Sequence, residues 1–493
     1  MVEILERKNK EIACLKHNMK ILEEHIVFLN RKLFGKKKET IIDDGNYLPM
    51  DLEPPALEKE EPVQEELKKV VKKKRKKFSR FNFPDDAPRE EEVFDLSEEE
   101  KEGLKYIGSD IVEKLAYRPG NYFIKVIITK KYAKLDKPEL GIFIPEKPQA
   151  AIPGSRIDES MLATILVDKY CDHLPLYRLE QKYARDGLYI SRKTLSALSL
   201  KAGSLIEPLA ELLLKEIMAS QVIFTDDSTV SLQQKGGCKT SRLWVYAGGA
   251  SGDPPLIYYQ FTKDRKEIHS LRKFENYKGI FHSDIYSVYE KIAKYDDITW
   301  QPCWAHARRK FFEALTNHSL KGTVLQLMDN LFMHERKVWE VESSENTRSQ
   351  KNYLKLKIRK EECLPIVDNI FNSIKESVKK GEHRPKEKLT LAIAYLLKRE
   401  DYFKNFLKNP DIRIDNNVSE RNIRPLAIGR KNWLFVGSEK GGQTLASVMS
   451  LVQTCKNLNI NPREYLEDVL KKINNTPKNL LTSLLPQNFK KIQ

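Results

Sequence analysis

The sequence predicts an α/β protein built on a mixed β-sheet with helices on its faces. Three apolar segments read as antiparallel-type strands: "QVIFTDDSTVSL", which begins at Gln221, then "SRLWVYAGG" and "PLIYYQFT". A strand-to-helix step then follows twice, in "YKGIFHSDIYSVYEKI" and "DITWQPCWAHARRKFFEAL". This order of elements is typical of a mixed sheet covered by helices. A length of 493 residues exceeds one ordinary hydrophobic core, so roughly three domains are expected.

The first segment, residues 1–35, carries a heptad pattern and is predicted to be a coiled coil that mediates self-association. A lone amphipathic helix packed on the body is the alternative. The repeat is formed at one seam position by Leu5, Ile12, Met19, Ile26 and Leu33, and at the other by Leu15, Leu22 and Leu29.

Residues 36–87 are acidic, then strongly basic, and are predicted to be a disordered linker because such a run cannot bury apolar area. A solvated linker and an arm that lies along phosphates are equally favoured interpretations. The basic residues proposed to contact DNA are Lys72, Lys73, Lys74 and Arg75.

Residues 88–150 contain the β-rich stretch "YFIKVIITKKYAKL" and are predicted to form a small β-rich module. Residues 151–215 become helical, with a turn at Gly187 and a second helix capped by Ser191. A helix-turn-helix that reads DNA and a plain helical hairpin both fit this pattern.

Composition points to a polyanionic partner. The 86 Lys and Arg exceed the 70 Asp and Glu, which gives a net charge of +16. This balance favours nucleic acid first and an acidic membrane surface second. The six scattered cysteines include no Cys-x-x-Cys pair, which argues against a disulfide framework or a zinc ribbon and for a cytoplasmic protein. We expect neither a signal peptide nor a membrane span, since no apolar run is long enough.

Three acidic residues form the candidate catalytic group. Asp226, followed by Asp227, comes after the strand expected at 221–225, and Asp284 ends another apolar strand. A sheet brings strand ends together, so Asp226 and Asp284 can lie side by side although 58 positions separate them. Glu420 supplies the third acid. Oxygen ligands suit Mg²⁺, and two such ions ~3.5–4 Å apart serve phosphoryl displacement.

Each acid also has a structural interpretation. Asp226 or Asp227 would cap a turn, and Asp284 would cap the helix that starts at Tyr286. Asn417 and Glu420 would form a capping box. Taken singly, each structural interpretation is favoured, whereas the joint pattern on a basic chain favours catalysis.

Basic residues near these acids are the candidate phosphate contacts. Glu420 and Arg424 are spaced for an i,i+4 pair that orients the carboxylate. His306 contacts the scissile phosphate or a flipped base, or instead supports the sheet; Cys303 is expected to be a packing residue. The proposed DNA-binding residues of this region are Arg421, Arg424, Arg430, Lys431, Arg308 and Arg309.

The segments "FTDDSTV", "GIFHSDIYSVY" and "IDNNVSERNIRPLAIGRKNWLFVGSEKGG" resemble the signature blocks of DDE transposases of the insertion sequence 66 family. Segments such as "CWAHARRKFF" and "NPREYLEDVL" also resemble that family, in the expected order. The resemblance implies a ribonuclease-H-like core at 216–312 and 409–440 with an Asp226, Asp284, Glu420 triad. Apolar residues recur at three- and four-residue spacing in "VLQLMDNLFMHERKVWEV" and "LTLAIAYLLKREDYFKNFL", which predicts a helical insertion at 313–408; a separate helical domain with no role in DNA work is the alternative. C-terminal helices are expected at 441–493.

The sequence departs from this family's pattern in three respects. Asp227 stands where the family usually has Glu, which makes it a candidate substitute for Asp226. Ser228 and Thr229 stand where Thr and Pro are typical. The family's zinc-binding cysteines are missing from 88–150, so we expect no zinc there.

The resemblance implies a transposase that cuts and joins DNA with two Mg²⁺, with Mn²⁺ as a substitute ion. Expected partners are the element ends and target DNA and further copies of the chain; the need for helper proteins stays open. No membrane partner is expected, and the location would be cytoplasmic and nucleoid-associated. Two rivals are a structure-selective nuclease of the same fold and a catalytically inactive DNA-binding regulator.

Overall fold

The computed structural model describes residues 88–97, 99–100, 104–118, 120–134, 142–249, 255–314, 318–381, 383–384 and 386–490. The coiled coil predicted at 1–35 lies outside these residues. So does the linker predicted at 36–87, with Lys72, Lys73, Lys74 and Arg75.

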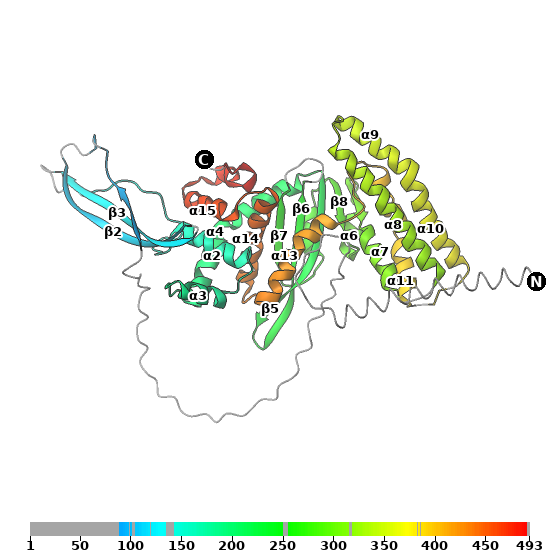
Figure 1. Ribbon diagram of the computed structural model, residues 1–493, viewed down its shortest axis with the longest axis horizontal. Coiled ribbons are helices and arrows are strands. Elements are labelled where there is room, and N and C mark those ends of the chain that lie inside the picture. Colours follow the sequence, from blue (N-terminus) through cyan, green and yellow to red (C-terminus); the bar gives the residue numbers. More distant parts are fainter. Residues whose placement is uncertain are drawn as a thin grey trace, which may run out of the picture. The chain divides into compact units, whose positions relative to one another are not determined.

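The core is a five-stranded mixed sheet, as the sequence predicts (Figure 1). Its strands are β5 (Val222–Gln234), β6 (Gly237–Gly248), β7 (Ile257–Thr262), β8 (Gly279–Ser283) and β9 (Ile298–Pro302), in the order β7-β6-β5-β8-β9. β5, β6 and β7 pair antiparallel, whereas β5, β8 and β9 pair parallel. Nearly every residue of β8 is buried, as expected for a parallel strand that is covered on both faces.

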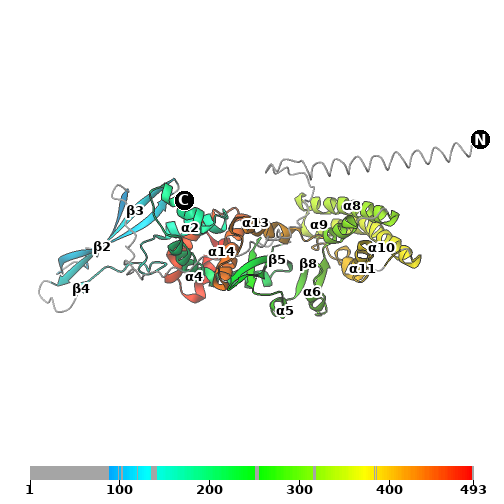
Figure 2. The ribbon, with the colours of Figure 1, turned by 90° about the horizontal axis from the view of Figure 1, so that it is seen from below.

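Two long helices, α4 (Arg192–Met218) and α14 (Glu439–Asn457), pack on each other and on β7 (Figure 2). They approach so closely that a Cβ on Gly203 would lie 2.3 Å from Thr444 Cγ2. α14 also covers the edge of the sheet: the backbone N–H groups of Ile257 and Tyr259 donate to the hydroxyls of Thr454 (3.0 Å) and Ser450 (2.8 Å). Edge N–H groups left unpaired would invite strand addition, so this helix closes the sheet on the β7 side.

Before α4 the chain forms α2 (Glu159–Tyr170) and α3 (Leu176–Arg185). Gly187 adopts φ +79° at the turn after α3, and the Ser191 side chain accepts a hydrogen bond from Thr194 N at 3.2 Å. The predicted helix, glycine turn and serine-capped helix are therefore confirmed.

A second, four-stranded sheet precedes these helices. It contains β1 (Arg89–Phe94), β2 (Leu104–Arg118), β3 (Asn121–Lys134) and β4 (Ile142–Phe143), with β3 between β1 and β2. β3 covers the stretch that the sequence predicts as β-rich.

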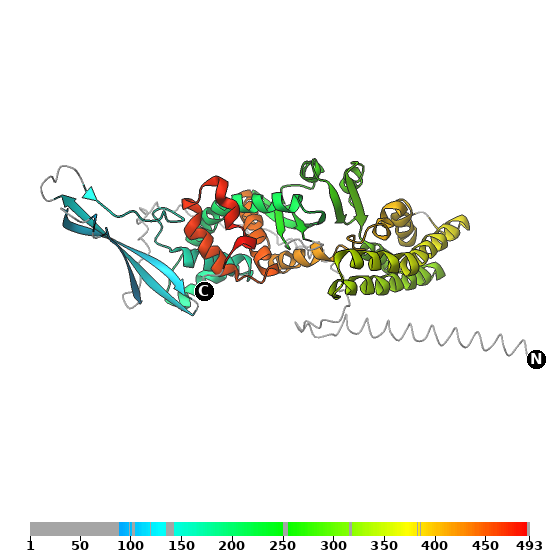
Figure 3. The ribbon, with the colours of Figure 1, turned by 90° about the horizontal axis from the view of Figure 1, so that it is seen from above.

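Most of the described residues in the insertion predicted at 313–408 are helical. After α5 (Ile268–Phe274), α6 (Ser287–Ile292) and α7 (Trp304–Glu313), the chain forms α8 (Ser319–Glu340), α9 (Arg348–Ile358), a π-helical turn (Arg359–Cys363), α10 (Leu364–Lys379), α11 (Lys388–Leu397) and α12 (Glu400–Phe403). α8 and α10 pack side by side (Figure 3).

The chain returns to the core sheet through α13 (Asn417–Trp433) and ends with α14 and α15 (Pro462–Lys472). Short 3-10 segments lie at Val341–Ser343, Asn405–Leu407, Ile473–Asn475, Lys478–Leu484 and Pro486–Asn488. Among the described residues, no helix combines the length and the apolar character needed to cross a bilayer.

Candidate active site

Asp226 and Asp284 are brought together by the parallel pairing of β5 and β8. The last matched pair is Phe224 with His282, whose rings stack with centroids 4.3 Å apart. Asp226 follows Phe224 by two residues, and Asp284 follows His282 by two residues. Asp226 shares a face with Phe224, because side chains two apart on a strand point the same way. Asp284 directly follows the end of β8 at Ser283, close enough for its charge to act on Asp226.

One detail of the prediction is wrong. β5 does not end at Thr225 but continues to Gln234, because it pairs with β6 in a long antiparallel hairpin. Only its pairing with β8 stops, at Phe224. Asp226 therefore lies on a continuous strand, just past the point where β8 stops pairing with it.

Glu420 reaches the same region through a segment that is fastened to the sheet. The backbone N–H of Arg413 donates to His282 Nε2 at 3.0 Å, and Trp304 N donates to the carbonyl of Ile414 at 2.8 Å. The side chain of Asn416, which is fully buried, donates to the carbonyl of Thr225 at 2.9 Å. α13 thus begins beside β5, and Glu420 lies in its first turn.

The capping box predicted for Asn417 and Glu420 is wrong. Asn417 is the first residue of α13, and the N-cap, Asn416, makes no side-chain cap bond. The amide of Asn416 binds β5 instead, while Asp415 Oδ1 accepts the N–H of Asn417 at 3.1 Å. This use of Asn416 leaves the carboxylate of Glu420 free of a capping role. The sequence analysis did not identify Asn416, although the adjacent asparagines in "DNNVSE" are a visible signal for it.

The three carboxyl groups share an unfavourable electrostatic environment. Burial, with repulsion from Asp284, Asp227 and Glu420, raises the pKa of Asp226 well above its usual value. Burial and the Asp227 charge raise the pKa of Asp284 to about 6, against the opposing charges of Arg265, Lys310 and Arg242. Burial likewise raises the pKa of Glu420, against Arg309 and Arg424. Asp284 Oδ1 and Glu420 Oε1 are buried and accept no hydrogen bond. A bound cation would relieve this repulsion.

Asp227 has a different role from its neighbour. Its carboxylate is 1% exposed and is held by Arg242 Nη1 at 2.9 Å and Arg265 Nη2 at 2.7 Å. Both oxygens are therefore occupied, so the structure does not support Asp227 as a substitute for Asp226. No motif marked Arg242 and Arg265 in the sequence.

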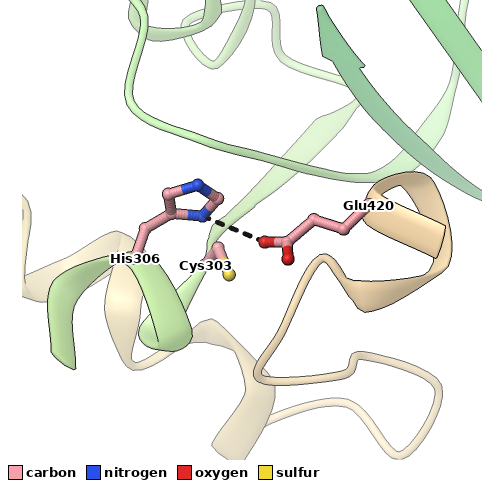
Figure 4. A group of neighbouring side chains, drawn as sticks. All are labelled: Cys303, His306 and Glu420. Carbon is pink, nitrogen blue, oxygen red and sulfur yellow. Dashed lines mark ion pairs between the residues drawn. The ribbon is translucent and has the colours of Figure 1, made fainter. Parts of the chain in front are cut away.

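Glu420 also contacts α7, as Figure 4 shows. His306 Nδ1 lies 3.5 Å from Glu420 Oε1. Cys303, His306 and Glu420 each offer one ligand atom, and these three atoms lie within 4.8 Å of one another. Among the residues that the structure describes, this is the group of three that could hold a metal ion. Asp226 and Asp284 do not belong to it. Burial and the charges of Arg309 and Lys310 lower the pKa of His306 to about 4, so its imidazole is neutral at neutral pH.

The predicted DNA-binding residues fall into three groups. Arg430 donates to Ser228 Oγ (3.1 Å) and to the carbonyl of Thr229 (2.6 Å), and Arg308 pairs with Asp329 at 2.6 Å. These two guanidinium groups are engaged within the protein. The charges of Arg309 and Arg424 act on Glu420. Arg421 and Lys431 are exposed on α13.

Comparison with known protein families shows to which family the chain belongs. A model described as "Transposase IS66 family" matches residues 154–444, well over half of the chain and all three acids. The chain belongs to the IS66 family of transposases. Two further matches fit this membership: the IS66 C-terminal element at residues 450–487, and "Transposase C of IS166 homeodomain" at residues 21–91.

Relatives of this IS66-family protein occur in Sinorhizobium fredii. The uncharacterized protein y4qI is 32% identical over 400 residues, covering 78% of this chain and 72% of the relative. The uncharacterized protein y4hP is 29% identical over 445 residues, covering 85% of this chain and 78% of the relative.

Proposed function

We propose that the protein cuts and joins DNA as a transposase, with Asp226, Asp284 and Glu420 as its catalytic acids on a ribonuclease-H-like core. One observation carries the proposal. Asp226 on β5 and Asp284, directly after β8, lie near each other at the core sheet, and α13 brings Glu420 to the same region. All three belong to the part of the chain that matches the transposase family.

The acids fit hard divalent cations. They offer oxygen donors, which Mg²⁺ and Mn²⁺ prefer. Their raised pKa values and the unpartnered oxygens of Asp284 and Glu420 support the same interpretation. When bound, two such ions would stabilise the attacking and leaving oxygens of a phosphoryl transfer.

The surrounding residues of the chain prepare this site. Arg242 and Arg265 fix Asp227, which keeps β5 in place next to Asp226. Asn416 ties the start of α13 to the same strand. Arg421 and Lys431 extend outward from α13, where they would hold DNA phosphates.

DNA recognition would involve other parts of the chain. The α3–α4 helix pair and the basic residues near Lys72 are the proposed contacts, and the homeodomain match at 21–91 supports a DNA-binding role for the N-terminal region. We further propose that copies of the chain assemble through the N-terminal heptads and act in the cytoplasm at the nucleoid.

The test uses duplexes copied from the DNA that flanks the gene, incubated with purified protein and Mg²⁺. Wild type should nick the duplex and join the 3′ end to target DNA. Asp284→Asn and Glu420→Gln should each lose at least ~100-fold in rate, more than the loss of an outer-shell partner costs. Asp297→Asn, which changes an exposed acid paired with Lys278, is the matched control.

Wild-type rates in either catalytic variant would refute the assignment of the acids. Cleavage without joining would support the structure-selective nuclease instead. No cleavage at any Mg²⁺ or Mn²⁺ concentration would support a DNA-binding regulator.

A further inference from the structure

We propose that Cys303, His306 and Glu420 form a second cation site, selective for Zn²⁺-class ions, that withdraws Glu420 from the catalytic acids. The site joins two elements: Cys303 is the N-cap of α7 and His306 lies in its first turn, whereas Glu420 comes from α13. Residues three apart at a helix start share a face, so the thiol and the imidazole point the same way.

The distances between the ligand atoms approach those of a tetrahedral site. Zn–N and Zn–S bonds of ~2.0 and ~2.3 Å place neighbouring ligand atoms roughly 3.3–3.6 Å apart. His306 Nδ1 and Glu420 Oε1 already lie 3.5 Å apart, and all three ligand atoms are within 4.8 Å. Closing this set requires the widest pair to move by about an ångström. Three protein ligands leave the fourth position for water.

Two ligand atoms have no hydrogen-bond partner. Both His306 Nδ1 and Glu420 Oε1 are buried and unpartnered, although they face each other (Figure 4). The third, Cys303 Sγ, accepts the backbone N–H of Asn416 at 3.3 Å. Burial and the charges of Glu420 and Asp415 raise the pKa of this thiol, so the bound ion itself would release the thiol proton. An ion at the centre would satisfy the atoms that the fold leaves without partners.

The donor set distinguishes this site from the one proposed for catalysis. Thiolate and imidazole select Zn²⁺ or Co²⁺, whereas three carboxylates select Mg²⁺ or Mn²⁺. Glu420 is common to both sets, so an ion held against α7 keeps its carboxylate from Asp226 and Asp284. The charges of Arg309 and Lys310 reach His306, so this site should be weaker than a structural zinc site.

The deciding experiment titrates metal-free, full-length protein with Co²⁺ and records the absorption spectrum. Wild type should show a thiolate-to-cobalt charge-transfer band in the near ultraviolet together with visible bands of tetrahedral cobalt. Cys303→Ser should lose the charge-transfer band, while the matched control Cys238→Ser, which removes an exposed thiol, should keep it. Glu420→Gln, which leaves the thiol in place, should weaken Co²⁺ binding at least tenfold.

A wild-type protein without the charge-transfer band, or a band unchanged in Cys303→Ser, would overturn the site. The inhibitory effect rests on the proposed function: added Zn²⁺ should slow Mg²⁺-dependent nicking in wild type and not in Cys303→Ser. Equal inhibition of both proteins would overturn the regulatory part. If neither protein nicks DNA, the catalytic proposal fails, while the cobalt spectrum still decides the metal site.

Discussion

The helical insertion and the acid-bearing part of the core sheet both bury ionisable side chains. The insertion pairs its buried charges, whereas the sheet leaves buried carboxylate oxygens without hydrogen bonds. In the insertion, Arg359 is fully buried and pairs with Glu335 through Nε at 2.7 Å and Nη2 at 2.8 Å. Its remaining N–H groups donate to the carbonyls of Phe406, Asn409 and Ile412, each at 2.7 Å. Every charge in this group has a partner.

At the sheet, Asp284 and Glu420 keep buried oxygens without hydrogen bonds, and their pKa values are raised. Burying a charge is costly unless it is paired, so the unpaired group is the one that needs an external cation. Arg359 and Glu335 therefore stabilise the fold, whereas the carboxylates of Asp284 and Glu420 are available for function.

The two regions are also connected. The carbonyls that Arg359 holds belong to residues 406–412, directly before the segment that delivers Glu420. The insertion therefore fixes the path by which the third acid returns to the sheet.

The largest loss of stability is expected from Arg359→Met. This change leaves the Glu335 carboxylate buried without its partner and removes the donors from three carbonyls, which should lower the free energy of unfolding by about 3–5 kcal/mol. Urea unfolding followed by circular dichroism measures it. The double variant Glu335→Leu with Arg359→Met should recover part of the loss, because neither charge then remains. A loss below about 1 kcal/mol in the single variant, as for an exposed pair, would contradict the comparison.

Asp227→Asn should cause the next largest loss of stability. The carboxylate is held by two arginines that are themselves partly exposed, so the expected loss is about 1.5–3 kcal/mol, the range for hydrogen bonds to charged groups. Asp226→Asn, one residue away, is the matched control and should not lower stability in the absence of divalent ions, because it removes repulsion. Equal losses in both variants would show that the two neighbours do not differ in role.

The pH dependence of stability tests the raised pKa of Asp284. Its value of about 6 in the folded protein lies above its ordinary value of 3.8, so between these values the folded state holds a proton that the unfolded chain has released. The contribution of this group to stability is therefore present below about pH 4 and is lost as the pH rises through about 6. Compared with Asp284→Asn, wild type should become progressively less stable over that interval.

This measurement is made without divalent ions, and adding Mg²⁺ should reduce the difference between the two proteins. Parallel pH profiles for wild type and Asp284→Asn would show that the Asp284 carboxyl is not perturbed by burial.

The smallest effect is expected from Arg308→Met. Its pair with Asp329 is exposed on both sides, so the free energy of unfolding should change by no more than about 1 kcal/mol. Thermal unfolding at low and high salt checks it, with Arg359→Met measured beside it. A loss comparable to that of Arg359→Met would mean that exposure does not govern the value of an ion pair in this protein.

Much of the fold follows from local patterns in the sequence. The antiparallel-type strands, the strand ending at Asp284, the serine-capped α4 and the helical insertion were predicted from periodicity, capping residues and turns. The capping box at Asn417 failed because a distant partner, the Thr225 carbonyl, captures the neighbouring asparagine. The end of β5 was misplaced because its antiparallel pairing with β6 continues after its pairing with β8 stops.

The sequence by itself determined the residue types of the candidate site, the order of the elements and membership of a transposase family. Only the tertiary structure decided which acid is neutralised by arginines, which asparagine ties α13 to the sheet and which side chains gather around Glu420. The physical reason is that helix and strand signals act between near neighbours in the chain. The contacts that decide the site join segments far apart in the chain, 38 positions for Asp227 and Arg265 and 191 for Thr225 and Asn416, and only packing brings them together.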